Sequence, residues 1–420
     1  MPESRIIDDV EKSHIVLTRL PDLELWAQMK SYNCPISFDL EITARCNNDC
    51  RHCYICKSQD DSSSRAKELS LNEIMQIADK AVSMGVLWCN ITGGEPLLRE
   101  DFFEVYIGLK RMGLLVSLFT NACLIREEHI ELFKKYPPRD IEVTVYGITK
   151  ETYESVSRRP GSYDAFQRGL NLLLKNGIPV RLKAMALRSN VHELPQIAEF
   201  CRARTKDYFR FDPLLHLRLD RDPIRNEVIK SERLSPEEIV SIERADSERF
   251  NALEKGCNKL IRQEFCDKQC NHLFHCGTGA GSFVLGCDSR FRLCSSLYHP
   301  DCTYDLRNGT LADAWKEFVP KVQDMRSNRS EFLDTCRTCP IINLCLWCPD
   351  HAYLEMGELD SHLPYFCQVA YARAKSIIKE NRIEAKSVGL LPAGILLNRN
   401  DEIKQSAHIC NNRSTNREIN

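Results

Sequence analysis

Between residues 35 and 212 the sequence alternates short apolar runs with amphipathic stretches, and this alternation restricts the fold more than any other feature. The strand-like runs cover residues 36–43, 86–92, 114–120, 141–147, 178–187 and 208–212. Helical stretches separate them, and the first opens on a capping box at Ser70 and Glu73. Strands that alternate with helices at this interval form βαβ units with a parallel sheet. Because six units are too few to close an eight-stranded barrel, we predict an α/β fold with a partial, open (β/α)6 barrel.

Small and polar residues gather at the ends of these strand-like runs. The motifs that follow the first, second, third, fourth and sixth runs read CNNDC, TGGEP, TNAC, YG and FDP. Ligands of parallel α/β folds bind at the carboxyl ends of the strands. The sequence therefore predicts a binding site at this edge of the sheet, and Tyr146, Asp212 and His216 are expected near its mouth.

Cysteine is the residue whose frequency is unusual. The 420-residue chain contains 21 cysteines and has a net charge of −2. The absence of a basic cluster predicts no nucleic-acid partner, and the absence of a long apolar run predicts no membrane span. The amino terminus lacks the apolar segment of a secretory signal, so we expect a cytoplasmic protein. Thiols stay reduced there, so clustered cysteines indicate metal binding, while Cys89, Cys123 and Cys201 are expected to be buried apolar residues.

The first cysteine cluster directly follows the first strand-like run. Cys46, Cys50 and Cys53 have the spacing C-x3-C-x2-C. Three thiolates at this spacing can hold three corners of a four-iron, four-sulfur cluster and leave the fourth iron without a protein ligand. Cys56 follows closely, but a fourth thiolate would block the open iron, so we expect Cys56 to be a loop thiol.

A second motif, TGGEP, follows the second strand-like run. Gly93 and Gly94 allow the backbone to approach a ligand closely, and Glu95 adds a carboxylate beside it. A glycine pair alone is weak evidence, since a simple strand-to-helix turn contains the same residues. Its position one βα unit after the cysteine motif makes a binding function the stronger interpretation.

Together the two motifs resemble the radical S-adenosylmethionine (SAM) superfamily over residues 35–212. The resemblance implies that Cys46, Cys50 and Cys53 bind a [4Fe-4S] cluster whose open iron is chelated by SAM. It also implies reductive cleavage of SAM to methionine and a 5′-deoxyadenosyl radical, which abstracts hydrogen from a substrate. His52 stands where many members have an aromatic residue. The residues expected to contact SAM are Gly93, Gly94 and Glu95 at its methionine end, and Asn121, Thr144 and Asn190 at its ribose or adenine.

A second field of cysteines lies between residues 266 and 367. Its C-x2-C pairs are compatible with zinc as well as with iron–sulfur clusters, and spacing alone leaves this open. The field resembles the SPASM extension of radical SAM maturases, which carries two auxiliary [4Fe-4S] clusters. This resemblance implies that the inner cluster is held by Cys270, Cys276, Cys294 and Cys348, and the outer cluster by Cys336, Cys339, Cys345 and Cys367.

Two departures from the SPASM pattern affect this assignment. Ser289 replaces the usual glycine five residues before Cys294, and the gap before Cys348 has two residues where three are common. The cysteines left without an assigned role are Cys266, Cys287 and Cys302. Full cysteine ligation favours electron relay over direct substrate binding as the function of the auxiliary clusters.

The resemblance implies an enzyme that oxidatively modifies a peptide or protein and takes electrons from a partner such as flavodoxin or ferredoxin. Ser295 stands where the sulfatase-activating members carry an aspartate base, which weakens a formylglycine-forming function. A small-molecule substrate in cofactor biosynthesis is the alternative, and a non-catalytic iron–sulfur protein is a remote one. The expected divisions are an extension (1–34), the partial barrel (35–212), a bridging segment with a helix (213–265), a loop-rich SPASM-like domain (266–367), and a helix with a polar tail (368–420). Within the bridging segment, residues 213–233 are expected to be a connection, and a helix is expected from Ser235 to about Lys255 with its end at Gly256.

Overall fold

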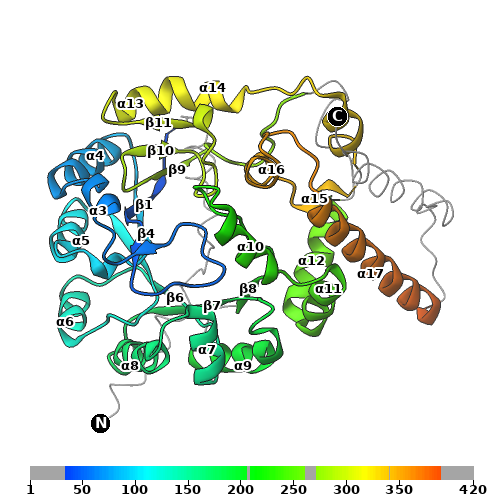
Figure 1. Ribbon diagram of the computed structural model, residues 1–420, viewed down its shortest axis with the longest axis horizontal. Coiled ribbons are helices and arrows are strands. Elements are labelled where there is room, and N and C mark those ends of the chain that lie inside the picture. Colours follow the sequence, from blue (N-terminus) through cyan, green and yellow to red (C-terminus); the bar gives the residue numbers. More distant parts are fainter. Residues whose placement is uncertain (1–33, 206–208, 261–270, 340, 389–420) are drawn as a thin grey trace, which may run out of the picture.

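The computed structural model describes residues 34–205, 209–260, 271–339 and 341–388. Its main feature is a mixed sheet with the strand order β11-β10-β9-β1-β4-β5-β6-β7-β8. Helices surround the outer face of this curved sheet (Figure 1). The expected extension at residues 1–34, apart from Cys34, and the polar tail beyond residue 388 lie outside the described residues. No helix of the described ranges combines the length and apolar character needed to cross a bilayer.

Six parallel strands form the predicted partial barrel. Each pairs in parallel with the next strand along the chain. The strands are β1 (Ser37–Thr43), β4 (Trp88–Gly93), β5 (Leu115–Thr120), β6 (Ile141–Thr144), β7 (Val180–Met185) and β8 (Arg210–Asp212). This confirms the predicted fold class.

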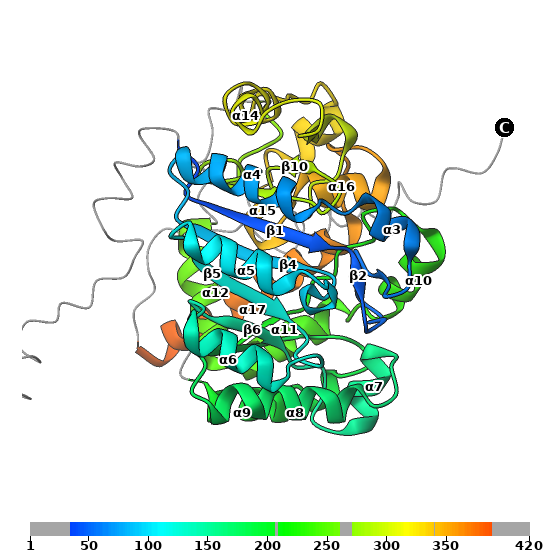
Figure 2. The ribbon, with the colours of Figure 1, turned by 90° about the vertical axis from the view of Figure 1, so that its left-hand side faces the viewer.

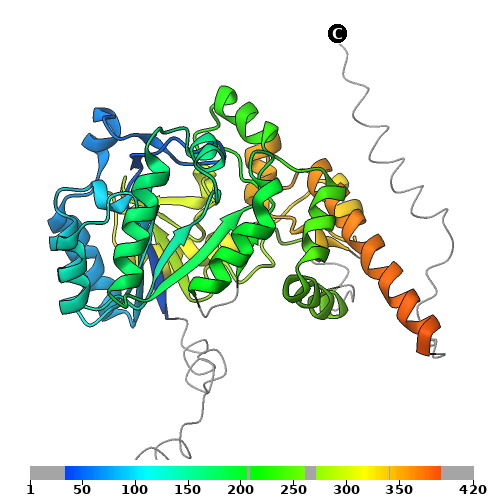
Figure 3. The same cartoon turned by 90° about the horizontal axis from the view of Figure 1, so that it is seen from below.

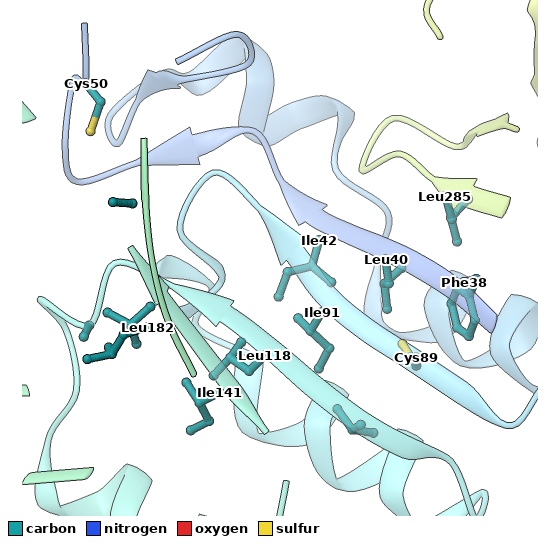
Figure 4. Close-up of a cluster of buried hydrophobic side chains, with 14 of the residues drawn as sticks. Phe38, Leu40, Ile42, Cys50, Cys89, Ile91, Leu118, Ile141, Leu182 and Leu285 are labelled. Carbon is teal, nitrogen blue, oxygen red and sulfur yellow. The ribbon is translucent and has the colours of Figure 1, made fainter. Parts of the chain in front are cut away.

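Alternation along the strands divides apolar from polar residues. Figure 4 shows Phe38, Leu40 and Ile42 of β1 projecting to the same side as Ile91 of β4 and Leu118 of β5. These side chains are at most 2% exposed and pack beneath the helices. The helices that follow the strands are α4 (Leu71–Ser83), α5 (Phe102–Arg111), α6 (Glu127–Lys135), α7 (Lys150–Ser157), α8 (Ser162–Lys175) and α9 (Leu194–Arg204). The predicted capping box opens α4, where the Glu73 amide donates to the Ser70 hydroxyl at 3.3 Å.

The C-terminal cysteine field contributes strands to the barrel sheet, which the prediction of a loop-rich domain did not include. β9 (Ser282–Leu285) pairs in parallel with β1, and β10 (Arg290–Arg292) and β11 (Thr303–Asp305) add antiparallel strands outside it. Phe283 of β9 stacks on Phe38 of β1 with ring centroids 5.3 Å apart. Strands of three or four residues show no periodicity in the sequence, so only this distant packing defines them.

The bridging segment is more helical than predicted. Residues 213–233 were expected to be a connection, but α10 (Pro223–Ser231) forms within them. The helix expected from Ser235 to Lys255 is two helices, α11 (Pro236–Ala245) and α12 (Ser247–Leu260), so the predicted end at Gly256 is wrong. The break falls at Asp246, where the backbone is extended. The Asp246 carboxylate accepts a hydrogen bond from the Arg249 amide at 3.0 Å, which caps the start of the new helix.

The last helices extend the molecule beside the barrel. α15 (Ile342–Cys345) and α16 (Pro349–Met356) precede the long helix α17 (Pro364–Val388). In Figure 3, α17 (orange) lies next to the green helices α11 and α12. Arg373 of α17 donates to the Glu243 carboxylate of α11 at 2.7 and 2.9 Å, with both side chains 2% exposed. This buried ion pair fastens the C-terminal helix to the bridging segment.

Candidate active site

The first cysteine cluster lies in a loop whose base is closed by backbone pairing. Figure 2 shows β1 leading into β2 (Arg45–Cys46) at the edge of the barrel where α3 (Ser62–Lys67) and α10 lie. β2 pairs in parallel with β3 (Lys57–Ser58), and the Lys57 amide donates to the Ala44 carbonyl at 2.9 Å. The intervening loop therefore leaves and returns at one point of the carboxyl edge of the barrel.

Four thiols converge inside this loop. Cys50 and Cys56 are buried, and Cys46 and Cys53 are half-buried. The thiol of Cys56 contacts those of Cys46 and Cys53 and donates to the Asn48 carbonyl at 3.1 Å. Burial raises the pKa of Cys50 well above that of an ordinary thiol. Converging buried thiols of this kind fit a soft-metal centre, because bound iron favours the thiolate form that burial disfavours.

The two glycines of the TGGEP turn lie against the backbone of the cysteine loop. The Gly94 amide donates to the Thr43 carbonyl at 2.7 Å, and the Glu95 amide donates to the Arg45 carbonyl at 2.9 Å. A Cβ atom on Gly93 would lie 2.2 Å from the Thr43 oxygen, and one on Gly94 would lie 2.2 Å from the Arg45 oxygen. Close approach to the cysteine loop is therefore one reason that this turn requires glycine.

Glu95 is fully buried and connects the ends of β4 and β5. One carboxylate oxygen accepts from the Thr120 hydroxyl at 2.8 Å and the Leu97 amide at 3.1 Å, and the other accepts from the Asn121 amide at 2.8 Å. Burial raises the pKa of Glu95 to about 7, although these hydrogen bonds favour the charged form. The structure thus gives Glu95 a positioning role, while its predicted contact with SAM stays a prediction.

Asn121 connects β5 to the cysteine loop. Its side-chain amide nitrogen lies 2.7 Å from the Asn47 oxygen and 3.7 Å from the Cys46 sulfur. Its side-chain oxygen accepts from the Cys123 amide at 2.9 Å. Asn47 is buried inside the cysteine motif and was not predicted as a site residue, although its place between two candidate ligands was a usable signal.

The other two residues predicted at the nucleoside differ in their surroundings. Thr144 ends β6 and is half-buried. The Asn190 side chain is buried; its nitrogen donates to the Tyr146 and Met185 carbonyls, both at 3.0 Å, and its oxygen accepts from the Leu187 amide at 2.9 Å. Asn190 therefore joins the ends of β6 and β7. Contact with the nucleoside of SAM remains a prediction for Thr144 and for Asn190.

Aromatic rings line the loop on its barrel side. The His52 ring lies 5.3 Å from that of Tyr146, and burial lowers the pKa of His52 to about 4. The Tyr54 ring lies 5.9 Å from that of His216. Two of the three residues expected near the mouth, Tyr146 and His216, are thus beside the cysteine loop, whereas Asp212 ends β8 with an exposed side chain.

The bridging segment supports the loop in a way that the sequence did not reveal. The buried Arg218 guanidinium donates to the Cys56 carbonyl at 2.9 Å and to the Asp220 carboxylate. Lys57 also pairs with Asp220 at 2.6 Å, and the Leu219 amide donates to the Tyr54 carbonyl at 3.0 Å. The bridging residues are more than 150 residues away from the loop residues that they contact, so no local pattern predicts these contacts.

The second cysteine field forms two groups among the described residues. Cys345 lies close enough to Cys336 and Cys339 for their charges to affect its pKa, and Cys348 has the same relation to Cys294. Burial raises the pKa of both Cys345 and Cys348 to about 12. The interleaved assignment implied by the SPASM resemblance stays a prediction. Its remaining members are exposed Cys276, half-buried Cys367, and Cys270, which lies outside the described residues.

Ser289 and two of the three cysteines without an assigned role lie among the described residues. Ser289 has a φ of +70° and thus adopts the left-handed conformation that glycine adopts readily. Cys302 is fully buried and its sulfur lies 3.7 Å from the Met325 sulfur, which is a packing contact. Cys287 lines a cavity between β1 and the cysteine loop, together with Glu41 and Tyr54. Cys266 lies outside the described residues.

The fold and the converging thiols define the class to which this domain belongs. Residues 40–201 match the family described as the radical SAM superfamily, and the chain therefore contains a radical SAM domain. Similar curated proteins include the AdoMet-dependent heme synthase of Methanosarcina barkeri (29% identical over 40% of this chain) and the subtilosin biosynthesis protein AlbA of Bacillus subtilis (30% identical over 40%). A probable GTP 3′,8-cyclase of Methanococcus maripaludis is 28% identical over 46% of the chain.

These alignments cover 48%, 37% and 66% of the three relatives, so the chain spans only part of the length of each. Two solved structures share the fold over most of the chain. Streptococcus suis SuiB bound to precursor peptide SuiA has a TM-score of 0.58, 15% identity, and coverage of 81% of this chain and 78% of its own. The enzyme anSMEcpe with bound AdoMet has a TM-score of 0.57, 15% identity, and coverage of 85% and 96%.

Proposed function

We propose that the chain is an enzyme that reductively cleaves SAM and oxidatively modifies a peptide or protein. The observation that carries this proposal is the convergence of the Cys46, Cys50 and Cys53 thiols at the carboxyl edge of a six-stranded partial barrel. When bound there, a reduced [4Fe-4S] cluster and SAM supply a 5′-deoxyadenosyl radical that abstracts hydrogen from the substrate.

The chain's own residues position these groups and exclude water. Cys46, Cys50 and Cys53 would hold the cluster, and the Gly93–Gly94 backbone, which already follows the cysteine loop, would meet the methionine end of SAM. Glu95 orients this turn, and Asn121, Thr144 and Asn190 stand at neighbouring strand ends for the nucleoside. The half-buried ring of His52 and the buried ring of Tyr146 would limit the access of water to the loop.

The second cysteine field would hold two auxiliary [4Fe-4S] clusters that relay electrons. The proximity of Cys294 to Cys348, and of Cys345 to Cys336 and Cys339, supports two separate ligand groups. The sheet that joins β9 to β1 brings this field next to the barrel. We further propose a cytoplasmic location and a flavodoxin or ferredoxin as the reducing partner.

A peptide substrate is favoured by three similar proteins. AlbA is a biosynthesis protein of the bacteriocin subtilosin, and SuiB and anSMEcpe have been solved with bound peptides. The test is co-expression of the full chain with short peptides encoded beside its gene, followed by mass spectrometry. A peptide mass lowered by the loss of hydrogen supports the proposal; unchanged peptides from every neighbouring reading frame contradict it.

A small-molecule substrate is the second candidate. It is favoured by the heme synthase and the GTP 3′,8-cyclase, which match the chain as well as AlbA does. The same experiment separates the two candidates if purified enzyme is also incubated with a cell metabolite extract. Consumption of a metabolite that depends on SAM, with all peptides unchanged, would favour this second function.

A further inference from the structure

Three side chains outside the cysteine groups converge where the barrel meets the second cysteine field. His216 follows β8, and Asp350 and His351 lie in the first turn of α16, directly after Cys348. One ligand atom from each lies within 4.8 Å of the others. The His351 Nε2 is 2.8 Å from the His216 Nδ1, which in turn is 4.0 Å from a carboxylate oxygen of Asp350.

This group is buried, and part of its hydrogen-bonding capacity is unused. Asp350 is 1% exposed and His351 is 8% exposed. Within the described part of the chain, the two carboxylate oxygens of Asp350 have no hydrogen-bond partner. The same is true of the His351 Nδ1. The Tyr298 backbone amide faces the carboxylate without reaching hydrogen-bond geometry. A buried carboxylate without hydrogen-bond partners is costly, and a bound cation would offset that cost.

The two arginines near this group of side chains form ion pairs with other carboxylates. Arg233 pairs with Glu355 and donates to the Leu215 carbonyl at 3.0 Å. Arg292 pairs with Glu41. Neither guanidinium forms an ion pair with the Asp350 carboxylate in the structure, so the site has an uncompensated acceptor.

We propose that His216, Asp350 and His351 bind one divalent transition-metal ion of the zinc class. Two imidazoles and one carboxylate are a ligand set that leaves a coordination position open for a substrate atom. Ligand atoms around tetrahedral zinc lie roughly 3.3 Å apart. The Nε2 atoms of His216 and His351 are already 3.3 Å apart, whereas the Asp350 carboxylate, 4.0 Å from the His216 Nδ1, must move closer to the imidazoles. The metal ion would supply the cationic partner that the Asp350 carboxylate does not have.

The position of this site between the two cysteine regions indicates a substrate-binding role for the ion. His216 contacts Tyr54, which follows Cys53 of the first cysteine loop, and Asp350 follows Cys348 of the second field. A metal ion here would bind a carboxylate, amine or thiolate of a substrate between the two cysteine regions. The metal site does not depend on the proposed SAM chemistry and can be tested separately.

The test measures metal content in the full chain with its iron–sulfur clusters reconstituted. The protein is dialysed anaerobically against Zn²⁺ and desalted, and zinc, iron and acid-labile sulfide are then quantified. We expect one zinc ion per chain in the wild type, loss of that ion in His351→Ala and in Asp350→Asn, and no change in iron or sulfide. The matched control is His299→Ala, because His299 also packs against α16, with its ring 4.6 Å from that of Tyr353.

Equal zinc content in wild type and His351→Ala would overturn the proposal. Zinc loss accompanied by equal loss of iron and sulfide would also overturn it, because these residues would then serve a cluster. X-ray absorption at the zinc edge is measured on the wild type, so its result does not depend on the folding of any variant. Two imidazole ligands with one oxygen support the site, while sulfur ligands would place the ion at cysteines and contradict it.

Discussion

Arg292 of β10 and Glu41 of β1 form a buried ion pair that joins the second cysteine field to the barrel. The Arg292 side chain is 0% exposed, and it also donates to the Ser295 carbonyl at 3.1 Å. Since Ser295 follows Cys294, one guanidinium connects the first barrel strand to a candidate ligand of the inner auxiliary cluster. The pair therefore couples the stability of the two cysteine regions.

Removing Arg292 tests this coupling. Arg292→Ala leaves the Glu41 charge buried and unpaired, so we expect the free energy of unfolding to fall by about 3–5 kcal/mol. Urea unfolding of the cluster-free protein measures the change. Arg290→Ala is the matched control, because Arg290 lies on the same strand with a 46% exposed side chain and should cost less than about 1 kcal/mol. Equal effects of the two variants would contradict the coupling.

The contact between Gly94 and Arg45 predicts a sharp steric effect. In Gly94→Ala the new methyl group would lie 2.2 Å from the Arg45 carbonyl oxygen, so the backbone of the cysteine loop must move. We expect a large loss of bound iron after reconstitution, with the chain still folded by circular dichroism. Gly281→Ala is the control, since its methyl group would meet only Ile36 at an ordinary 3.4 Å. Full iron content in Gly94→Ala would show that the turn does not support the loop.

Glu95 predicts a pH dependence of stability. Its pKa is raised by burial from 4.5 to about 7 in the folded protein, so the folded state retains a proton that the unfolded state has lost. The resulting stabilisation is fully present below pH 4.5 and is lost as the pH rises to about 7; at 1.36 kcal/mol per pKa unit it amounts to at most about 3 kcal/mol. Urea unfolding of cluster-free wild type and Glu95→Gln between pH 5 and 8 measures the difference. Parallel pH profiles would contradict the shift.

The two cysteine groups of the second field predict how much bound iron each cysteine substitution removes. Cys348→Ala should remove one cluster's worth of iron and sulfide, because Cys348 lies beside Cys294 at the proposed inner cluster. Cys302→Ala should leave both contents unchanged, since Cys302 packs against Met325. Metal analysis with electron paramagnetic resonance distinguishes these results. Zinc in place of iron in the wild-type field would favour the alternative that the C-x2-C spacing leaves open.

The six barrel strands were predictable because each is a local apolar run between amphipathic helical stretches. The strand β9 was not, since its four residues are stabilised by Phe283 stacking on Phe38, which is distant in the sequence. The cysteine motif likewise located the loop. The glycine motif did not reveal that Gly94 packs against Arg45, because tertiary contacts of this kind leave no periodic pattern.

Contacts between residues far apart in the sequence also account for the site residues that were not predicted. Arg218 reaches the Cys56 carbonyl from the bridging segment, which has no regular pattern in the sequence. His216 was expected near the barrel mouth from its place after a strand, but its partner His351 is 135 residues away. Such pairs follow from how the C-terminal helices pack against the barrel, and single-sequence patterns do not contain that information.

We propose that Cys46, Cys50 and Cys53 support cleavage of SAM. The most direct measurement is the release of 5′-deoxyadenosine by reconstituted full-length protein with dithionite and SAM. We predict release by the wild type and by Cys201→Ala, whose cysteine is buried in α9 away from the loop, and none by Cys50→Ala. Equal release by Cys50→Ala and the wild type would contradict the account.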